Sequence, residues 1–394
     1  MTATPGPIEL PINLIHHFYP GGGAVAAFRG IEPGPAPSPE DWVGSTTPRL
    51  GESPSGLSRL EDGRLLVEAV EADPVGFLGP EHVEAFGSGT ALLVKLLDSS
   101  VRLIVHAHPD RDFARNHLGC AHGKTEAWVV LSEQPGEVFV GFTREVGAGE
   151  LAAWVAEQRV EEMLSTLNVL EVSRGDTVLV PAGIPHAIGP GVFVVELQEP
   201  TDFSIGLEHR DLEHADLDLG WPAVLGAIDR SAWDAARVQQ LRGPGLGQPG
   251  SVLARAADPF FRAEVSRPLT SPAGASGAAV AVPDAAGGLA PDRSDPHVAS
   301  GEDDLGRGFA ILVVLAGGGE LVTGSGSHLL RAGETLLLPY AAGPAKLRGD
   351  AVVLACRPPR PGPLEPPRPL VPEGRVRGAE LAGVAAPEPG APGT

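Results

Sequence analysis

The chain has 394 residues, and 29 Lys and Arg against 50 Asp and Glu give a formal net charge of −21. A charge this negative argues against nucleic acid and anionic membranes as partners, because phosphate groups bind to basic faces. A small phosphorylated substrate stays possible, since it needs only a local basic pocket. Apolar residues make up 42% of the chain, which is enough for sizeable cores in two or three domains.

The 52 glycines and 40 prolines indicate many turns and few long helices, and therefore a mainly β chain. Two cysteines, Cys120 and Cys356, cannot staple a fold of this size, which favours a reducing compartment. Residues 1–14 lack the basic and apolar regions of a signal peptide, and no run of about 18 apolar residues exists for a membrane span. We therefore expect a cytoplasmic protein. Its oligomeric state stays open, a monomer included.

The first half is expected to form short strands, followed by a helical segment and further strands. Aliphatic and β-branched runs bounded by turn residues predict strands at 64–70, 91–97, 101–108, 128–131, 138–142, 177–182 and 192–198. The Pro-, Gly- and Ser-rich segment 31–57 is expected to be loop. Apolar residues at helical spacing, from Leu151 to Leu164, predict two short helices within 147–167.

The second half is expected to begin with a mixed segment, 207–245, whose later part is helical. After the Gly- and Pro-rich run 243–250, strands are predicted at 260–267, 309–317, 319–324, 334–339 and 351–357. Residues 270–305 are expected to be a long polar loop, with a short strand inside it as the alternative. The Pro- and Gly-rich segment from about 361 to 394 is expected to be a disordered tail.

An internal repeat links the two halves. Gly175 is followed after five residues by Pro181, and Gly333 is followed in the same way by Pro339, with threonine in third place and aliphatic residues after it. A repeated unit of this kind predicts two similar small β barrels.

Two motifs in the first half carry candidate metal ligands. His106 and His108 stand at i and i+2, so on a strand their side chains point to the same face. The repeat unit continues past Pro181 to Gly183 and His186, which places a third imidazole after a tight turn. With Glu126, three imidazoles and a carboxylate suit a divalent transition ion, most simply zinc.

The alternative for each of these residues is an ordinary structural role. A lone histidine is more often a surface or core residue than a ligand, but three in this spacing favour a metal. Glu126, taken alone, could be a solvated carboxylate. We expect ordinary polar roles for His117, His122, His209 and His214, and a surface loop at His16 and His17. In the second unit no His-x-His precedes His328, and PYAAGPAK replaces PAGIPHAI, so the second barrel is expected to be structural.

The motifs His-x-His and G-x5-P-x-G-x2-H are those of the cupin barrel. The strings HPDRDFARNHLGCAHGKTEAWVVL and VSRGDTVLVPAGIPHAIGPGVFVVELQEPTDFSI resemble the type I mannose-6-phosphate isomerases of that superfamily. The resemblance covers roughly residues 15–358 and is strongest from 101 to 206. It implies two cupin (jelly-roll) barrels: a metal-binding unit at 1–206 with a helical insertion at about 147–167, a partly helical connector at 207–250, a metal-free unit at 251–360, and a tail at 361–394.

The resemblance also implies an activity, the interconversion of mannose 6-phosphate and fructose 6-phosphate by an aldose–ketose isomerase with one Zn2+ per chain. The ligands would be His106, where the family has glutamine, with His108, Glu126 and His186. The only partner expected is a small sugar phosphate. Two alternatives stay open: a zinc isomerase of another or unphosphorylated sugar, and a catalytically silent sugar-binding cupin.

Catalytic and substrate-binding residues are also implied. Glu196 matches a glutamate near the family's metal, and Lys124, one of three lysines in the chain, could transfer a proton or bind phosphate. Thr201 and Asp202 match a Ser/Thr-Asp pair of the family, but Gly206 stands where its arginine is expected, and Arg210 is the candidate substitute. Arg111 and Arg115 complete the basic residues near the expected site, with Arg111 and Asp202 expected to contact substrate.

Overall fold

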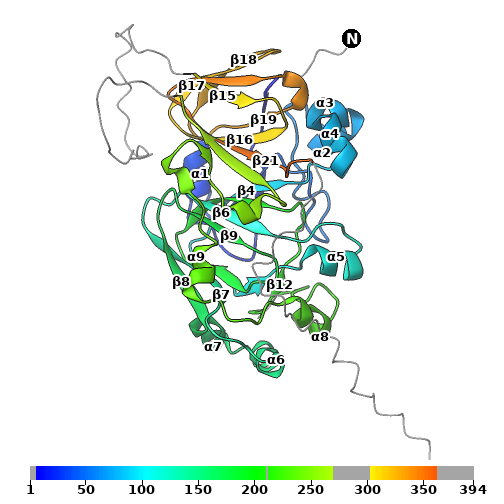
Figure 1. The fold of residues 1–394 in the computed structure, drawn as a ribbon, viewed down its shortest axis with the longest axis vertical. Helices are drawn as coiled ribbons and strands as arrows, with labels where there is room; N and C mark the ends of the chain where they lie inside the picture. Colours follow the sequence, from blue (N-terminus) through cyan, green and yellow to red (C-terminus); the bar gives the residue numbers. More distant parts are fainter. Residues whose placement is uncertain (1–5, 210–211, 269–301, 362–394) are drawn as a thin grey trace, which may run out of the picture.

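The computed structural model describes residues 6–209, 212–268 and 302–361. Four antiparallel sheets dominate the fold, and short helices lie around them (Figure 1). This confirms the predicted mainly β class.

Two of the sheets are built from strands of the first half. The inner N-terminal sheet contains, in spatial order, β2 (Leu14–Ile15), β3 (Glu40–Val43), β4 (Leu93–Asp98), β11 (Phe193–Gln198), β6 (Glu126–Val130) and β9 (Thr177–Val180). The outer N-terminal sheet contains β12 (Ile205–Gly206), β5 (His106–Ala107), β10 (His186–Ile188), β7 (Gly136–Phe142) and β8 (Leu167–Val172).

The other two sheets are built mostly from the second half. The inner C-terminal sheet contains β1 (Ile8–Glu9), β19 (Thr335–Leu338), β16 (Ala310–Ala316), β21 (Val352–Arg357), β14 (Arg262–Ser266) and β13 (Gly250–Ser251). The outer C-terminal sheet contains β15 (Glu302–Gly306), β20 (Ala345–Gly349), β17 (Gly318–Thr323) and β18 (Gly326–Arg331). Strand β1 thus crosses from the chain's beginning to pair with β19.

The sheets stack as four layers because alternate residues of a strand face opposite sides. Val94 and Leu96 of the inner N-terminal sheet share one buried cluster with Val313 and Leu354 of the inner C-terminal sheet, so these two sheets pack back to back. The other face of each inner sheet packs against its outer sheet. Figure 1 shows the layers from the outer C-terminal sheet at the top to the outer N-terminal sheet below.

Helices cover the edges and ends of this stack. They are α1 (Ala24–Arg29), α2 (Leu66–Ala72), α3 (Pro74–Leu78), α4 (Pro80–Phe86), α5 (Arg111–His117), α6 (Ala148–Glu157), α7 (Val160–Ser165), α8 (Trp221–Val224) and α9 (Ala235–Gln239), with short 3-10 turns at Leu225–Ala227, Gly245–Gly247, Arg255–Ala257 and Tyr340–Ala342. The pair α6 and α7 confirms the two helices predicted within 147–167. Within the described ranges, no helix has the length and apolar character needed to cross a membrane.

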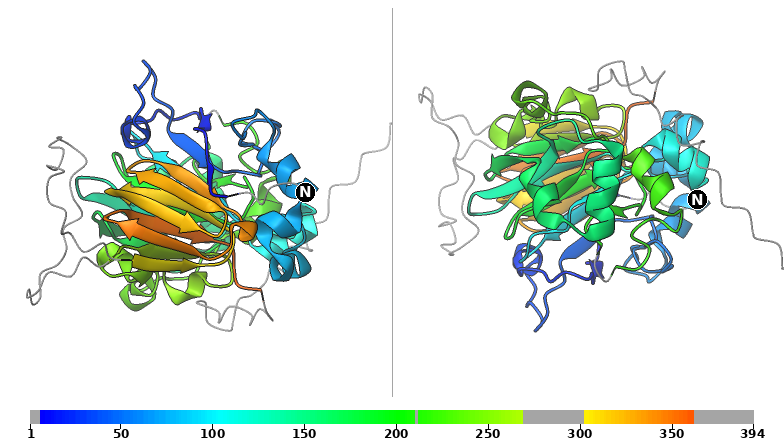
Figure 2. Two further views of the ribbon diagram at one scale, coloured as in Figure 1. Left: turned by 90° about the horizontal axis from the view of Figure 1, so that it is seen from above. Right: turned by 90° about the horizontal axis from the view of Figure 1, so that it is seen from below.

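The layers and the helices beside them are seen end on in Figure 2, where α2, α3 and α4 lie together at one side of the C-terminal strands. The strand predicted at 64–70 is wrong, because this segment enters α2. Leu66, Ala69 and Val70 are buried at i, i+3 and i+4, which is a helical face. A short apolar run does not distinguish a strand from a buried helix.

Two smaller differences between the predicted and the observed strands follow from strand pairing. The segment 31–57 contains β3, because Glu40–Val43 finds a partner in β4. In 101–108 only His106 and Ala107 are paired as a strand. The predicted loop at 270–305 falls mostly outside the described residues, although Glu302–Gly306 forms β15, and the tail beyond 361 lies outside them as well.

The internal repeat is confirmed in backbone geometry. Gly175 and Gly333 both have positive φ, 94° and 82°, and each precedes a four-residue strand, β9 or β19. Glycine adopts this conformation without the cost that a Cβ imposes.

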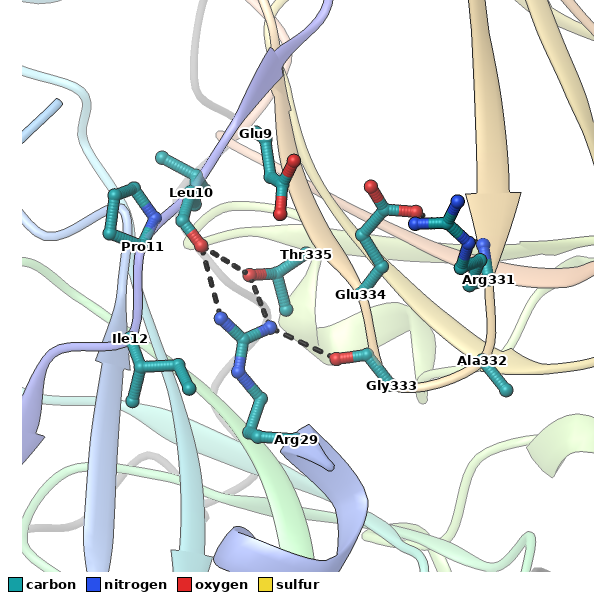
Figure 3. Close-up of a pocket in the computed structure, with 10 residues that line it drawn as sticks. All are labelled: Glu9, Leu10, Pro11, Ile12, Arg29, Arg331, Ala332, Gly333, Glu334 and Thr335. Carbon is teal, nitrogen blue, oxygen red and sulfur yellow. Dashed lines mark hydrogen bonds between the residues drawn. The ribbon is translucent and has the colours of Figure 1, made fainter. Parts of the chain in front are cut away.

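A buried arginine ties the first residues to the second half. Arg29 donates from Nη1 to the Gly333 carbonyl at 3.0 Å and from Nη2 to the Leu10 carbonyl at 3.0 Å, as the dashed lines in Figure 3 show. Its Nε lies 3.1 Å from the Asp41 carboxylate. The inner sheets are therefore joined by charge-assisted hydrogen bonds as well as by apolar packing.

Candidate metal centre

The three predicted imidazoles meet between the N-terminal sheets. His106 on β5 is directly opposite His186 on β10, and paired residues of antiparallel strands share a face. His108 follows two residues after His106. One ring nitrogen from each of the three lies within 4.8 Å of the others.

The turn after β9 brings His186 to this place. Gly183 has φ 87°, and its N–H donates to the His108 carbonyl at 2.7 Å. The chain then returns along the outer sheet as β10. The G-x5-P-x-G-x2-H spacing therefore serves to hold the third histidine beside the first two.

Each imidazole has its Nδ1 at hydrogen-bond distance from a backbone carbonyl. The partners are Ile104 for His106 at 2.9 Å, Phe203 for His108 at 2.8 Å and Ile184 for His186 at 2.8 Å. Donation from Nδ1 leaves the Nε2 lone pair free. The buried Nε2 atoms of His108 and His186 form no well-aligned hydrogen bond with a described residue and face the Glu126 carboxylate instead, as expected of atoms that surround a metal ion.

Glu126, the first residue of β6, supplies a carboxylate to the same point. Its two oxygens lie 3.0 Å from His108 Nε2 and 3.3 Å from His186 Nε2. Burial, assisted by the charge of Lys124, lowers the pKa of His108 to about 3. Burial opposes the charge on Glu126, but His108 and His186 outweigh it and hold the pKa of that carboxyl well below its usual range. Neutral imidazoles with one carboxylate are a donor set that fits zinc.

Beside these four residues, a band of polar side chains crosses the inner N-terminal sheet. Glu196 on β11 is paired in register with Lys95 on β4 and with Trp128 on β6, so all three face the same interior. Lys95 Nζ lies 3.3 Å from Glu196 Oε2, and Trp128 Nε1 donates to Glu196 Oε1 at 3.2 Å. Burial and the charge of Glu126 raise the pKa of Glu196, which makes it a stronger base.

Glu40 on β3 extends this band, and sequence reasoning missed it together with Lys95. Lys95 Nζ lies 3.7 Å from Glu40 Oε2, and the same carboxylate accepts hydrogen bonds from Trp42 Nε1 at 2.6 Å and from the Tyr19 hydroxyl. Burial disfavours the charge on Lys95, but Glu40 and Glu196 outweigh it and raise its pKa. The only signal in the sequence was the scarcity of lysine, since Lys95 is one of three.

The Lys124 ammonium lies close enough to His108 to lower the pKa of that imidazole. The Lys124 side chain is buried, with 5% of the residue exposed, and its ammonium reaches Ser204 Oγ at 3.4 Å. It forms no ion pair with any residue of the described ranges. A buried ammonium without a carboxylate partner can receive an anionic group of a ligand.

The other predicted residues are placed less favourably. Arg111 pairs with the buried Glu199 and lies 4.6 Å over the ring of Phe260, so its charge is already balanced. Arg115 pairs with Asp112 on the surface. Asp202 accepts a hydrogen bond from the Leu50 N–H at 3.1 Å. Arg210 lies outside the described residues.

Gly206 on β12 is directly opposite His106. A side chain at this position would share the face of His106, and its Cβ would make only ordinary contacts, the nearest to Ile104 at 3.4 Å. The face is therefore one where an arginine could reach the site, and this chain has none at that position.

A second group with a histidine lies in the other half. Glu9, His328 and Glu334 come close enough to share an ion, beside the pocket of about 380 Å³ drawn in Figure 3. His328 Nε2 is already 2.6 Å from Glu334 Oε1, and Glu9 is exposed. Unlike His108 and His186, His328 has no buried ring nitrogen without a hydrogen-bond partner among the described residues.

Comparison with known proteins agrees with the resemblance. No family model matches the sequence. Mannose-6-phosphate isomerase from Streptococcus mutans is 32% identical over 157 residues, which are 39% of this chain and 47% of that relative, so the chain spans about half the length of the curated relatives it matches. A mannosephosphate isomerase from Archaeoglobus fulgidus, described by its authors as putative, superimposes with a TM-score of 0.65 at 20% identity over 91% of this chain and all of that one.

The chain has the fold of the mannose-6-phosphate isomerases. A zinc-bound mannose 6-phosphate isomerase also superimposes, with a TM-score of 0.64 and 16% identity over 90% of this chain and all of that one. The shared fold and the matched segment confirm the resemblance that the motifs predicted. The interior site described above is thus presented on a scaffold that occurs in isomerases.

Proposed function

We propose that this chain is a zinc-dependent aldose–ketose isomerase that interconverts mannose 6-phosphate and fructose 6-phosphate. The observation that carries the proposal is the convergence of three imidazoles whose Nδ1 atoms are held by backbone carbonyls. His106, His108, Glu126 and His186 would bind one Zn2+ per chain. The named relatives and the zinc-bound structure of the same fold support this reading.

The reaction moves a proton between C1 and C2 of the sugar through an enediol. When bound, zinc would hold sugar oxygens and stabilise their developing negative charge. Glu196 is the proposed base, because its raised pKa suits proton transfer and its carboxylate is oriented by Lys95 and Trp128. Lys95 would also prevent the carboxylate from turning away between the two proton transfers.

Lys124 is the proposed cation for the substrate. Arg111 and Arg115 are already paired with carboxylates, whereas Lys124 is buried beside His108 without an ion pair in the described part of the chain. The Asp202 carboxylate, held by the Leu50 N–H, would accept hydrogen bonds from sugar hydroxyls at the rim. Roles for Arg111 and for Arg210 remain part of the prediction made from the resemblance.

A second function is favoured by one observation. Gly206, opposite His106, leaves the site without the arginine that the family resemblance implies. This favours an isomerase of another or unphosphorylated sugar, with the same metal and the same base. A silent sugar-binding cupin is the remaining outcome, and it would bind metal and sugar without turnover.

We further propose that each pair of sheets is a cupin barrel, with a metal-binding unit at 1–206, a connector at 207–250 and a metal-free unit at 251–360. The equivalent repeat strands β9 and β19 support this division, and β1 would be the one strand exchanged between units. Cytoplasmic location and a sugar phosphate as the only partner complete the proposal.

The test is an assay of fructose 6-phosphate formation from mannose 6-phosphate by zinc-loaded protein. We expect turnover, one metal ion per chain by elemental analysis, and loss of both on chelation and in His186→Ala. His328→Ala is the matched control, since His328 lies in the other half, and it should retain both. Metal-dependent sugar binding without turnover would favour the silent cupin, and a chain without bound metal would contradict all three functions.

Lys124→Met tests the proposed role of the only buried lysine without an ion pair in the described residues. If its ammonium takes part in proton transfer, kcat should fall by about 10²–10⁴-fold. If it binds phosphate, KM for mannose 6-phosphate should rise while mannose itself is unaffected. Lys346→Met, on the exposed face of β20, is the control and should leave both constants unchanged. Unchanged kinetics in Lys124→Met would remove this residue from the site.

A further inference from the structure

A second pocket lies between α3 and α4 on one side and the C-terminal sheets on the other. Its volume is about 330 Å³, and its lining contains four arginines, Arg262, Arg307, Arg357 and Arg360, against two glutamates. This is a local excess of positive charge in a chain whose net charge is −21. None of these residues belongs to the proposed metal centre.

The buried Arg357 stabilises the backbone segment that carries Arg307. Arg357 is buried, and its guanidinium donates to the carbonyls of Leu305 at 2.7 Å and of Gly308 and Phe309 at 3.3 Å. Leu305 belongs to β15, and Gly308 and Phe309 belong to the turn between β15 and β16, which also contains Arg307. The hydrogen bonds of Arg357 therefore fix the backbone from which Arg307 projects.

Arg307 has a fixed platform but no anionic partner. Its guanidinium lies 5.0 Å over the ring of Tyr340, and it forms no ion pair or hydrogen bond with the residues that the structure describes. Tyr340 packs against Gly79 at the junction of α3 and α4, where a Cβ would come within 2.6 Å of the ring. Because Gly79, at φ 92°, has no Cβ, the Tyr340 ring can pack against it and line the pocket.

A second guanidinium without an anionic partner among the described residues comes from the segment 358–361, which also lines the pocket. Arg262 donates from Nε to the Pro358 carbonyl at 3.2 Å and from Nη1 to Glu264 at 3.3 Å, which holds the segment 358–361 against the pocket. Arg360 lies in this segment and forms no ion pair with a described residue. Glu264 also lies 3.7 Å from Arg357 Nε, so of the four arginines only Arg307 and Arg360 lack a carboxylate partner among the described residues.

We propose that this pocket is a binding site for a small phosphate ester, with Arg307 and Arg360 as its principal ligands. A guanidinium presents paired N–H donors that match two phosphate oxygens, and such forks are favoured for phosphate recognition. The pocket volume lies within the range of small-molecule sites. The Tyr340 ring offers an apolar face for the organic part of the ligand.

Isothermal titration of the full chain with glycerol phosphate, and with inorganic phosphate, at constant ionic strength tests the proposal. We expect saturable binding that weakens at least tenfold in Arg307→Ala and less in Arg307→Lys, which retains charge but not the fork. Arg331→Ala is the matched control, because Arg331 lines the pocket of Figure 3 and not this one. Equal affinity in wild type and Arg307→Ala, or no saturable binding by the wild type, would overturn the proposal.

Two further measurements keep the result unambiguous. Lys124→Met should retain this binding, and its loss there would assign the phosphate to the metal-centre side and contradict the pocket. Circular dichroism and the Tm without phosphate show whether Arg307→Ala is folded. If that variant does not fold, Arg360→Ala replaces it. Arg360 is exposed, so its substitution should weaken phosphate binding at least tenfold without affecting folding.

Discussion

The two pairs of sheets start from the same local unit and enclose different interiors. In the first half, β9 leads through Pro181 to His186, which opens β10 on the facing sheet. In the second half, β19 leads through Pro339 to Ala345, which opens β20. The interior beside His186 holds charged and aromatic side chains, whereas the cluster around Ala345 consists of alanine, leucine and valine.

The difference lies in the residues that face inward rather than in the strands. A buried charge is tolerated only where partners compensate for its lost hydration, and Lys95 meets this condition between Glu40 and Glu196. The interior of the second half needs no such set. We infer that the buried charges of the first interior lower stability and that the proposed function requires them, while the second interior contributes the apolar packing that supports the inner sheets.

Lys95→Met should give the largest loss of stability. Removing the ammonium leaves Glu40 and Glu196 buried without their shared counter-charge, and breaking a buried pair costs about 3–5 kcal/mol. The free energy of unfolding, measured by urea titration followed by tryptophan fluorescence, should fall by this amount at pH 7.

Lys346→Met is the matched control in the second half. Lys346 pairs with Glu302 on the surface, where water already solvates both charges, so the transition should not move. If both lysine variants unfold at the same urea concentration as the wild type, the charge of Lys95 is not required by this interior.

The convergence of the candidate ligands could be predicted from the sequence because these residues occur in short motifs. Two residues of a strand separated by one position share a face, so His106 and His108 could be paired directly. The meeting of His186 with His106 follows from the turn geometry that Gly183 permits. The repeat could also be predicted from a local pattern, because Gly175 and Gly333 both adopt the positive φ that precedes the repeated strand.

The remaining features depend on pairing between distant segments. Lys95, Glu40 and Glu196 come together only through the order β3, β4, β11, which no local pattern specifies. Arg111 could be chosen as a cation near the site, but its neutralisation by Glu199 depends on a contact across 88 positions of sequence. The apolar residues of the segment 64–70 fit a buried strand or a buried helix equally, so the local pattern alone does not predict α2.

Leu336→Ala should have the next largest effect and should leave the metal centre intact. Leu336 is fully buried between the C-terminal sheets, and truncation of a buried leucine costs about 2–5 kcal/mol through lost burial and the cavity that remains. Elemental analysis should still find the same metal content as in the wild type. Leu329→Ala on the neighbouring strand β18 is the control, since its side chain is largely exposed, and it should change stability by less than about 0.5 kcal/mol. A loss of metal in Leu336→Ala would show that the two interiors are not independent.

Glu40→Gln should have the smallest effect, and it should appear as a change in pH dependence. His17 does not point to the surface as predicted, because its Nε2 lies 3.2 Å from Glu40 Oε2. Burial alone would raise the pKa of Glu40, but His17 and Lys95 outweigh burial and hold it well below its usual range. As pH falls through the unfolded carboxyl pKa of about 4.3, the unfolded state takes up this proton first, so acid favours unfolding.

The free energy of unfolding of the wild type should therefore decrease below about pH 5, and the decrease should be shallower in Glu40→Gln, which cannot take up the proton. Each unit of lowered pKa corresponds to about 1.4 kcal/mol between the two limits. Glu302→Gln provides the comparison from the second half, because the pKa of Glu302 is lowered by Lys346 and Arg348 on the open surface. Solvent screens the interaction of Glu302 with these two cations, so Glu302→Gln should change the pH dependence of the unfolding free energy less than Glu40→Gln does. If the unfolding free energies of the wild type and Glu40→Gln change with pH in parallel, the charge of Glu40 has no net influence on folding. The two halves would then differ in the packing of their interiors but not in the contribution of this charge to stability.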